Sequence, residues 1–349
     1  MKNLYSIETN KEVNFLPTNA NCVESDILLS FGLNNYKSIS KVEKMNAGSL
    51  IYRIICTDGS FILRGSLYED LNTLESQCTI ANLLSKDLFL RPIRSKQGRY
   101  VFQSSGLLWI AYIMIEGKQF AGELEQLSSV LLKTLQLQRQ FDLIYKKENG
   151  RYIKNLRRAE YNAENWVDIV GWLSGNIEND AHSDLMLNIP KDIQTYFHLN
   201  REKLIKLIRL VASLDIHNTI VHYDLQHANI LIDNNIHCID IEDIVVSDKR
   251  IAVFHGAFKW VRHCIYVNNM SFNSAVKWLE TDCIDILEEE FKCKITLEYM
   301  GRYILFKLFS DLHLLLFNLI HCGKGELEYD LLKKIYNFFE IKDLFMDEL

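Results

Sequence analysis

The spacing of apolar residues changes once along the chain, near Gly117, and this change most limits the folds that the chain can adopt. Between about residues 40 and 115, short apolar runs such as SLIYRIIC and FILRGS are separated by turn residues such as TDGS, which is typical of strands joined by hairpins. Residues 72–86 instead carry apolar side chains at helical spacing. We therefore expect a small antiparallel sheet with one helix packed across it.

After Gly117 the apolar residues recur mainly at helical spacing, in one case behind a predicted cap at Asn200. The chain has 349 residues, more than one compact core usually holds. The pattern therefore predicts an α+β protein of two lobes. The N-terminal lobe is β-rich and spans residues 1–115, the C-terminal lobe is larger and mainly helical and spans residues 116–349, and a connector lies near residues 115–118.

Composition argues against several classes of protein. The net charge is −6 and no basic stripe is present, so nucleic acid is not an expected partner. Charges interrupt the N-terminus, and Lys307, Asp311 and His313 interrupt the most apolar window, residues 303–320, so we expect neither a signal peptide nor a membrane span. The eight cysteines form no C-x-x-C pair, which favours free buried thiols in a cytoplasmic protein without structural zinc.

Residues 221–243, VHYDLQHANILIDNNIHCIDIED, place ionisable side chains between apolar, β-prone segments. Burying such groups without partners is costly, so the stretch is expected to hold a ligand, a metal ion or a reacting group. IVHYDL, NILID and IHCIDI are predicted as short extended segments, with a turn at Asn234-Asn235 between the last two. The stretch is therefore the best candidate for a functional site.

His222, Asp224, Asn229 and Asp240 form the pattern H-x-D-x-x-x-x-N followed by an Asp within an apolar segment. Phosphoryl transfer from ATP requires a group that orients the acceptor hydroxyl and oxygen ligands that hold magnesium against the phosphates. In this interpretation Asp224 accepts or aligns the hydroxyl proton, and Asn229 and Asp240 bind Mg²⁺. His222 braces the loop through hydrogen bonds.

This stretch resembles the aminoglycoside phosphotransferase and choline kinase-like family, relatives of the protein kinases. VHYDLQHANIL and CIDIED match the family's His-x-Asp loop, the Asn five residues after the Asp, and the Ile-Asp strand that follows. The resemblance implies a two-lobed protein-kinase-like fold and the cofactors ATP and Mg²⁺. It also implies a small-molecule acceptor with a hydroxyl group, such as an amino sugar, a sugar, choline or an amino alcohol.

The same resemblance extends to the N-terminal lobe. NAGSLIYRIICTDGSFILRG looks like the family's phosphate-covering loop with its two flanking strands, so Gly48 and Ser49 are expected near the phosphates. Arg64 stands where the family has Lys or often Arg, and it is expected to contact the nucleotide. Glu75, in the following helix, is the predicted ion-pair partner of Arg64.

IAYIMIEGK resembles the family's lobe connector, where backbone groups around Met114 and Ile115 would meet the adenine edge. The acidic run LETDCIDILEEEF, residues 279–291, fits either a solvated helix face or a surface that attracts a cationic acceptor. Glu242 fits either a further metal ligand beside Asp240 or a solvated carboxylate next to the site.

Two other functions stay open from the sequence. The first is a non-catalytic kinase-like scaffold or coat protein, because the predicted phosphate loop has a single glycine and Arg64 replaces a Lys. The second is a metal-dependent hydrolase in which His222, Asp224, His227 and Asp240 are the ligands. The sequence makes no prediction of oligomeric state.

Overall fold

A six-stranded antiparallel sheet forms the N-terminal lobe, in the strand order β1-β2-β3-β4-β6-β5. The computed structural model describes residues 15–17, 23–42, 49–67, 70–148, 152–159, 163–174, 190–322 and 326–346. The strands of this sheet are β1 (Phe15–Pro17), β2 (Tyr36–Val42), β3 (Ser49–Cys56), β4 (Ser60–Ser66), β5 (Val101–Ser104) and β6 (Leu107–Ile113). The predicted TDGS hairpin joins β3 to β4, whereas β1 and most of β2 precede the segment expected to be strand-like.

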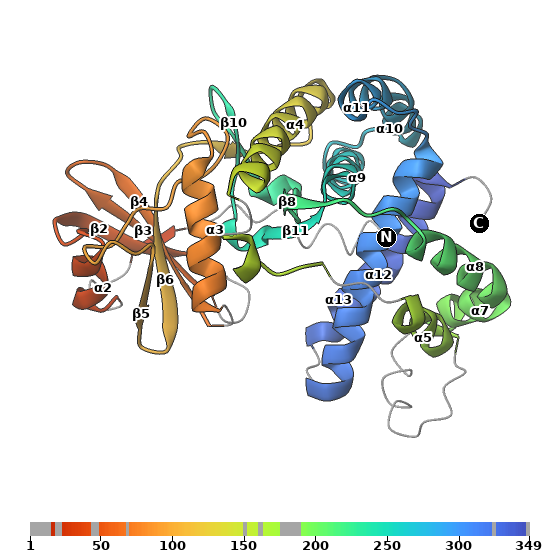
Figure 1. Cartoon of the computed structure of the whole chain (residues 1–349), viewed down its shortest axis with the longest axis horizontal. Coiled ribbons are helices and arrows are strands. Elements are labelled where there is room, and N and C mark those ends of the chain that lie inside the picture. The colour runs from red at the N-terminus through yellow and green to blue at the C-terminus, as the bar shows by residue number, and fades with distance from the viewer. Residues whose placement is uncertain are drawn as a thin grey trace.

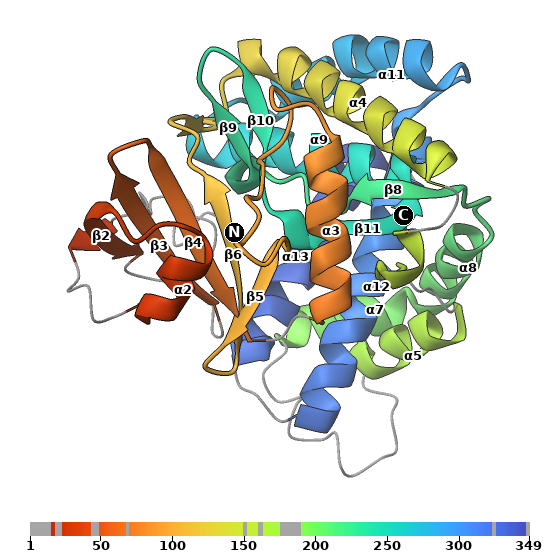
Figure 2. The same cartoon turned by 60° about the vertical axis from the view of Figure 1, so that its left-hand side comes forward.

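Helix α3 (Leu71–Leu83) lies between this sheet and the C-terminal lobe (Figure 2). Asp70 caps its first turn, because the Asp70 carboxylate accepts a hydrogen bond from the Thr73 amide at 2.8 Å. The opposite face of the sheet packs against α2 (Ser25–Ser30), with Ile27, Ile54 and Trp109 in a small second core. The predicted sheet with one helix packed across it is confirmed.

The C-terminal lobe is mainly helical (Figure 1). Its helices are α4 (Leu124–Lys147), α5 (Ala163–Leu173), α7 (Lys191–Leu199), α8 (Arg201–Ala212), α9 (Lys249–Val267), α10 (Phe272–Trp278), α11 (Ile284–Phe291), α12 (Leu297–Cys322) and α13 (Glu326–Phe345), with a π-helix at Leu279–Cys283. The apolar window at residues 303–320 lies in α12, which packs against α9 and α13. No helix in the described part of the chain is long and apolar enough to cross a membrane.

The chain changes sheets between Ile113, which ends β6, and Lys118, which begins β7 (Lys118–Gln119). Strand β7 pairs with β9 (Ile230–Ile232) in a three-stranded sheet of the C-terminal lobe, in the order β10-β9-β7. The predicted connector near residues 115–118 lies in this interval. The two lobes also touch elsewhere, because the Leu90 amide donates to the Cys238 carbonyl of β10 (Ile236–Cys238).

Two local predictions differ from the structure. Asn200 occupies the N-cap position of α8, but its side chain donates to the Tyr196 carbonyl at 2.9 Å and makes no cap hydrogen bond. Cys293 is exposed, so the prediction of buried thiols is wrong there. The other described free cysteine side chains are buried: Cys56, Cys78, Cys238, Cys264 and Cys283. Cys22 and the side chain of Cys322 lie outside the described residues.

Candidate active site

Two antiparallel strands, β8 (Asn218–His222) and β11 (Ile244–Asp248), carry the polar stretch, and the β9–β10 hairpin lies between them in sequence. Buried apolar side chains hold these segments in the core, among them Ile220, Ile230 and Ile244, each 0% exposed. The hairpin turns at residues 233–235, where the Asn235 amide donates to the Asp233 carboxylate. The segments predicted at 221–243 are therefore confirmed.

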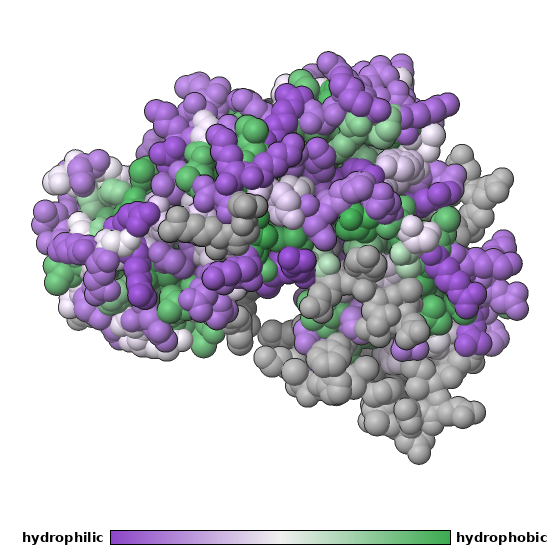
Figure 3. All heavy atoms as spheres, in the orientation of Figure 1, coloured by the Kyte–Doolittle hydropathy of each residue, from purple (hydrophilic) through white to green (hydrophobic). Residues whose placement is uncertain are grey.

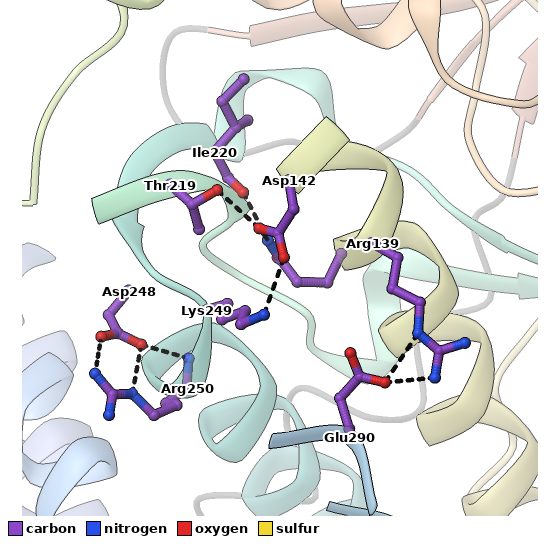
Figure 4. Close-up of polar contacts among 9 residues, drawn as sticks. Arg139, Asp142, Thr219, Ile220, Asp248, Lys249, Arg250 and Glu290 are labelled. Atoms are coloured by element: carbon purple, nitrogen blue, oxygen red, sulfur yellow. Dashed lines mark hydrogen bonds and ion pairs between the residues drawn. The ribbon is translucent and has the colours of Figure 1, made fainter. Parts of the chain in front are cut away.

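Polar contacts from α4 and α9 fix the start of β8 (Figure 4). Asp142 of α4 accepts hydrogen bonds from Thr219 Oγ1 at 2.8 Å and from Lys249 Nζ at 2.9 Å. One turn earlier on α4, Arg139 donates to Glu290 of α11. Because β8 leads directly into residues 222–229, these contacts position the loop that holds Asp224.

His222 is buried and its Nε2 lies 2.7 Å from the Ile239 carbonyl oxygen. A carbonyl can only accept, so Nε2 carries the proton of a neutral imidazole. Burial lowers the pKa of His222, although the charges of Asp240 and Asp224 oppose this effect. The neutral ring thus ties β8 to the segment before Asp240, which is the bracing contact that the sequence predicted.

Asn229 lies next to Asp224 and to the end of the hairpin. The side-chain Nδ2 of Asn229 donates to the backbone carbonyl of Asp224 at 2.9 Å. The backbone carbonyl of Asn229 accepts from the backbone amide of Ile239 at 2.9 Å. The amide group is oriented by this donation, which leaves Oδ1 as a potential metal ligand. Asn229 and the residue before Asp240 are therefore side by side, as the predicted hairpin required.

Asp240 has a left-handed backbone conformation, with φ of +77°. Such a conformation costs a non-glycine residue about 1–3 kcal/mol and is concentrated at functional sites. The Asp240 carboxylate accepts a hydrogen bond from Arg64 Nη1 at 3.0 Å. Burial alone would raise the pKa of Asp240, but contacts with Glu242, Arg64 and His222 outweigh it and lower the pKa.

Glu242 is buried rather than solvated, and its carboxylate pairs with Arg64 Nη1 at 2.5 Å. The sequence left its role open between a solvated carboxylate and a metal ligand, and the solvated alternative is wrong. The carboxylates of Asp240 and Glu242 converge on one guanidinium. These carboxylate oxygens and Asn229 Oδ1 are of the chemical type that binds a hard cation such as Mg²⁺.

The predicted ion pair between Arg64 and Glu75 is not formed. Both Glu75 carboxylate oxygens accept from backbone amides at the start of β5, those of Tyr100 and Val101, at 2.9–3.1 Å. The α3 side chain that reaches the site is Gln77, whose Nε2 donates to the carbonyls of Glu242 and Ile244. Arg64 instead pairs with Asp240 and Glu242 of the other lobe.

The remaining predicted nucleotide contacts lie at the edge of the N-terminal lobe. Gly48 is outside the described residues. Ser49 is the first residue of β3 and pairs with Ser66 of β4. Met114 and Ile115 are half-buried in the connector after β6. The Met114 amide donates to the Ser60 carbonyl at 2.9 Å, so a contact with an adenine edge would have to use the Met114 carbonyl or the Ile115 amide.

The hydrolase alternative lacks a ligand set. Among the residues that the structure describes, no three His, Cys, Asp or Glu side chains are gathered to hold a metal ion. The His227 ring is instead stacked on His263, with ring centroids 3.9 Å apart. Burial, His263 and nearby cations lower the pKa of His227 to about 3.

Asp224 is half-buried and lines a cavity of about 760 Å³ on the C-terminal-lobe side of the site. The space-filling view shows that the molecule is hollowed between the two lobes on the face of Figure 1 (Figure 3). Lys259 of α9 also lines the cavity and was missed by the sequence analysis. A signal was available, since Lys259 interrupts an otherwise largely apolar segment.

No protein-family model and no curated protein matches the sequence. Solved structures do match. One is the spectinomycin phosphotransferase APH(9)-Ia in complex with ADP and spectinomycin, with 14% identity, a TM-score of 0.61, and coverage of 93% of this chain and 94% of that one. Another is the amicoumacin kinase hAmiN in complex with AMP-PNP, Ca²⁺ and its ligand, with 14% identity, a TM-score of 0.57, and coverage of 88% and 90%.

A choline kinase from Cryptosporidium parvum Iowa II has 12% identity, a TM-score of 0.54, and coverage of 93% of this chain and 97% of that one. At 12–14% identity, the similarity to these structures shows a shared fold. It extends over nearly the whole of each chain, so both lobes are shared. The predicted two-lobed fold, an antiparallel sheet lobe followed by a helical lobe, is confirmed.

Proposed function

We propose that this chain, which has the fold of the aminoglycoside phosphotransferases and choline kinases, transfers the γ-phosphoryl group of ATP to a hydroxyl of a small molecule. The observation that carries the proposal is the arrangement of Asp224, Asn229 and Asp240. Asn229 is hydrogen-bonded to the backbone of Asp224 and of Ile239, so the three residues form one connected unit.

In the proposed reaction Asp224 orients the acceptor hydroxyl and takes its proton. The acceptor oxygen forms a bond to the γ-phosphorus, the bond from that phosphorus to the β,γ-bridging oxygen breaks, and ADP leaves with the electron pair. Asn229, Asp240 and Glu242 would hold magnesium. The chemistry that magnesium supplies when bound is neutralisation of charge on the phosphoryl group.

Arg64 is proposed to contact the nucleotide phosphates from β4, beside the backbone of Gly48 and Ser49. Its guanidinium pKa is raised because Glu242 and Asp240 outweigh the opposing effect of burial, so it is charged at any working pH. Met114 and Ile115 are proposed to border the adenine. The division into a nucleotide-binding lobe at residues 1–115 and an acceptor-binding lobe at residues 116–349 is part of the same proposal.

The test is phosphoryl transfer from ATP, with magnesium, to a panel of amino sugars, free sugars, choline and homoserine, followed by ADP release and product mass. Asp224→Asn should lower the turnover by about 100-fold or more. Asp285→Asn, on the exposed face of α11, is the matched control and should keep full activity. An Asp224→Asn protein as active as the parent would reject the proposal.

One observation favours the non-catalytic alternative, a kinase-like scaffold or coat protein. The cation proposed for phosphate contact is paired with two of the carboxylates proposed for metal binding, so these groups neutralise one another. Thermal unfolding with ATP, with and without magnesium, separates the two functions. A nucleotide-dependent rise in Tm supports the kinase, and an unchanged Tm supports the scaffold.

A further inference from the structure

The cavity beside Asp224 is richer in cations than in carboxylates. Among the described residues that line it, six are Lys or Arg and four are Asp. The cations come from the segment before α5 and from three helices: Arg157, Arg158, Lys259, Lys307, Lys333 and Lys334. The acidic run of residues 279–291 lies on the π-helix at Leu279–Cys283 and on α11, and none of its residues is among those that line this cavity.

Helix α9 contributes side chains to the cavity lining, and its residues 251–264 are all buried. Four His, Lys or Arg side chains lie in this buried segment. Two of them have partners within the protein: Arg262 Nε pairs with Glu340 at 2.6 Å, and His263 stacks on His227. The other two, His255 and Lys259, both line the cavity, and their described contacts are with the Phe258 ring, at 6.3 and 5.8 Å from its centroid.

Lys259 is 8% exposed, and its ammonium forms no ion pair and donates no hydrogen bond within the part of the chain that the structure describes. Burial, together with the charges of Arg262 and Lys334, lowers its pKa well below the ordinary value. Lysine is almost never this buried unless it is paired. A bound anion in the cavity would provide the missing partner.

His255 lies one helical turn before Lys259, on the same face of α9. It is 5% exposed, and its Nδ1 has no hydrogen-bond partner in the described structure. Burial and three neighbouring lysines lower the pKa of His255. A neutral imidazole with a free ring nitrogen can hydrogen-bond to a ligand beside Lys259.

Two further lysines on the wall of the cavity share a single carboxylate. Lys307 Nζ lies 3.2 Å from Asp311 Oδ2, and Lys334 pairs with the same oxygen. Lys307 also lies 4.0 Å from the ring centroid of Tyr223, the residue before Asp224. One carboxylate between two ammonium groups leaves a net positive charge close to the proposed catalytic residue.

We propose that the acceptor carries an oxyanion, a carboxylate or a phosphate ester, which Lys259, His255 and the Lys307–Lys334 pair bind while its hydroxyl faces Asp224. The inference rests on the proposed function and specifies its substrate class. An oxyanion and an ammonium group form a charge-assisted hydrogen bond, which is stronger than a hydrogen bond between two neutral groups. The volume of about 760 Å³ is ample for a phosphorylated or carboxylated sugar.

The experiment compares four acceptors built on one carbon skeleton: glucose, glucose 6-phosphate, gluconate and glucosamine. The two anions should exceed glucose and glucosamine by about tenfold or more in kcat/KM, the ratio expected for one hydrogen bond to a charged group. Comparison of the two anions distinguishes a phosphate ester from a carboxylate. A preference for glucose or glucosamine would overturn the inference and leave the proposed function intact.

Lys259→Met tests the residue itself, with exposed Lys277→Met on α10 as the control. We expect Lys259→Met to fold, because it removes an unpaired buried charge, and to lose the preference for anionic acceptors. Nucleotide-induced stabilisation should stay unchanged. An unaltered preference in Lys259→Met would overturn the inference.

Binding gives a readout that does not need turnover. Gluconate and glucose 6-phosphate should each raise the Tm of the parent and of Lys277→Met, but not that of Lys259→Met. If no acceptor is phosphorylated and these shifts occur, the anion site stands and the proposed function fails. If neither anion raises the Tm of the parent, the anion site is rejected.

Discussion

Arg64 of β4 donates a hydrogen bond to Asp240 across the two lobes, at 3.0 Å and over 176 positions of sequence. The same guanidinium nitrogen pairs with Glu242. The contact joins the sheet of the N-terminal lobe to the segment of the C-terminal lobe that carries the proposed metal ligands. The relative placement of the lobes therefore depends in part on one buried charge cluster.

Arg64→Met should destabilise the protein by about 2 kcal/mol, because it leaves the buried Glu242 carboxylate and the half-buried Asp240 carboxylate without their counter-charge. Urea unfolding measures the change. Arg64→Lys should recover part of the loss, since one ammonium can still face both carboxylates. Arg99→Met, at an exposed position of the same lobe, is the control. Equal stability of Arg64→Met and the parent would show that the cluster does not hold the lobes together.

Asp311 should make stability depend on pH in the acid range. Burial opposes its ionisation, but Lys307 and Lys334 outweigh that effect and lower its pKa from 3.8 to about 2. A carboxyl group whose pKa is lower in the folded state stabilises the protein above its unfolded pKa, and this stabilisation is lost as the pH falls through the folded pKa.

Asp311 should therefore contribute about 2 kcal/mol at neutral pH that disappears as the pH falls from about 4 to about 2. Urea unfolding across this range should show a shallower pH slope for Asp311→Asn than for the parent or for Asp285→Asn. Parallel slopes for Asp311→Asn and the parent would contradict the prediction.

His222→Phe should cost about 1 kcal/mol of stability or more, because it leaves the half-buried Ile239 carbonyl without its donor. Turnover should fall, since the segment before Asp240 loses its brace. The shape of the kcat/KM profile from about pH 7 to 8 should not change, because burial lowers the pKa of His222 below its ordinary value and the imidazole is neutral there. A step in the parent profile that vanishes in His222→Phe, but not in exposed His217→Phe, would assign His222 a proton-transfer role instead.

Gly65→Ala should destabilise the N-terminal lobe by about 1–3 kcal/mol. A Cβ at Gly65 would lie 2.8 Å from the ring of Trp109, which is its partner across β4 and β6. Gly171→Ala is the matched control, since nothing lies within 4 Å of a Cβ there and a helical Ala is more stable than Gly. Removing the ring with Trp109→Leu should abolish the cost of Gly65→Ala, and additive costs in the double variant would locate the strain elsewhere.

Features that depend on near neighbours in sequence could be predicted without the structure. The TDGS hairpin, α3 and the β9–β10 hairpin follow from apolar spacing and turn residues, which act within a few positions. His222, Asn229 and the residues around Asp240 meet because they lie within one short stretch whose turn returns the chain on itself. The order and spacing of these residues in the sequence were therefore enough to predict them as candidate site residues.

Contacts between distant segments could not be predicted in the same way. Glu75 was expected to face Arg64 from its place in the helix after β4, but its carboxylate meets the amides of β5 instead. The position of α9 likewise decided that Lys259 is buried beside Asp224, although 35 positions separate the two (259 − 224). The apolar residues around Lys259 indicated a buried helix, but not which groups its side chain would face.

The sequence by itself determined which residues form the loop, the hairpin and the two lobes, because hydrogen bonding and apolar spacing within each segment act locally. Only the tertiary structure decided which charges neutralise one another and which remain unpaired. Electrostatic interactions depend on distance and burial in three dimensions, and both are set by how the segments pack. The pairing of Arg64 with Asp240 and Glu242, and the burial of Lys259 without an ion pair among the described residues, are products of that packing.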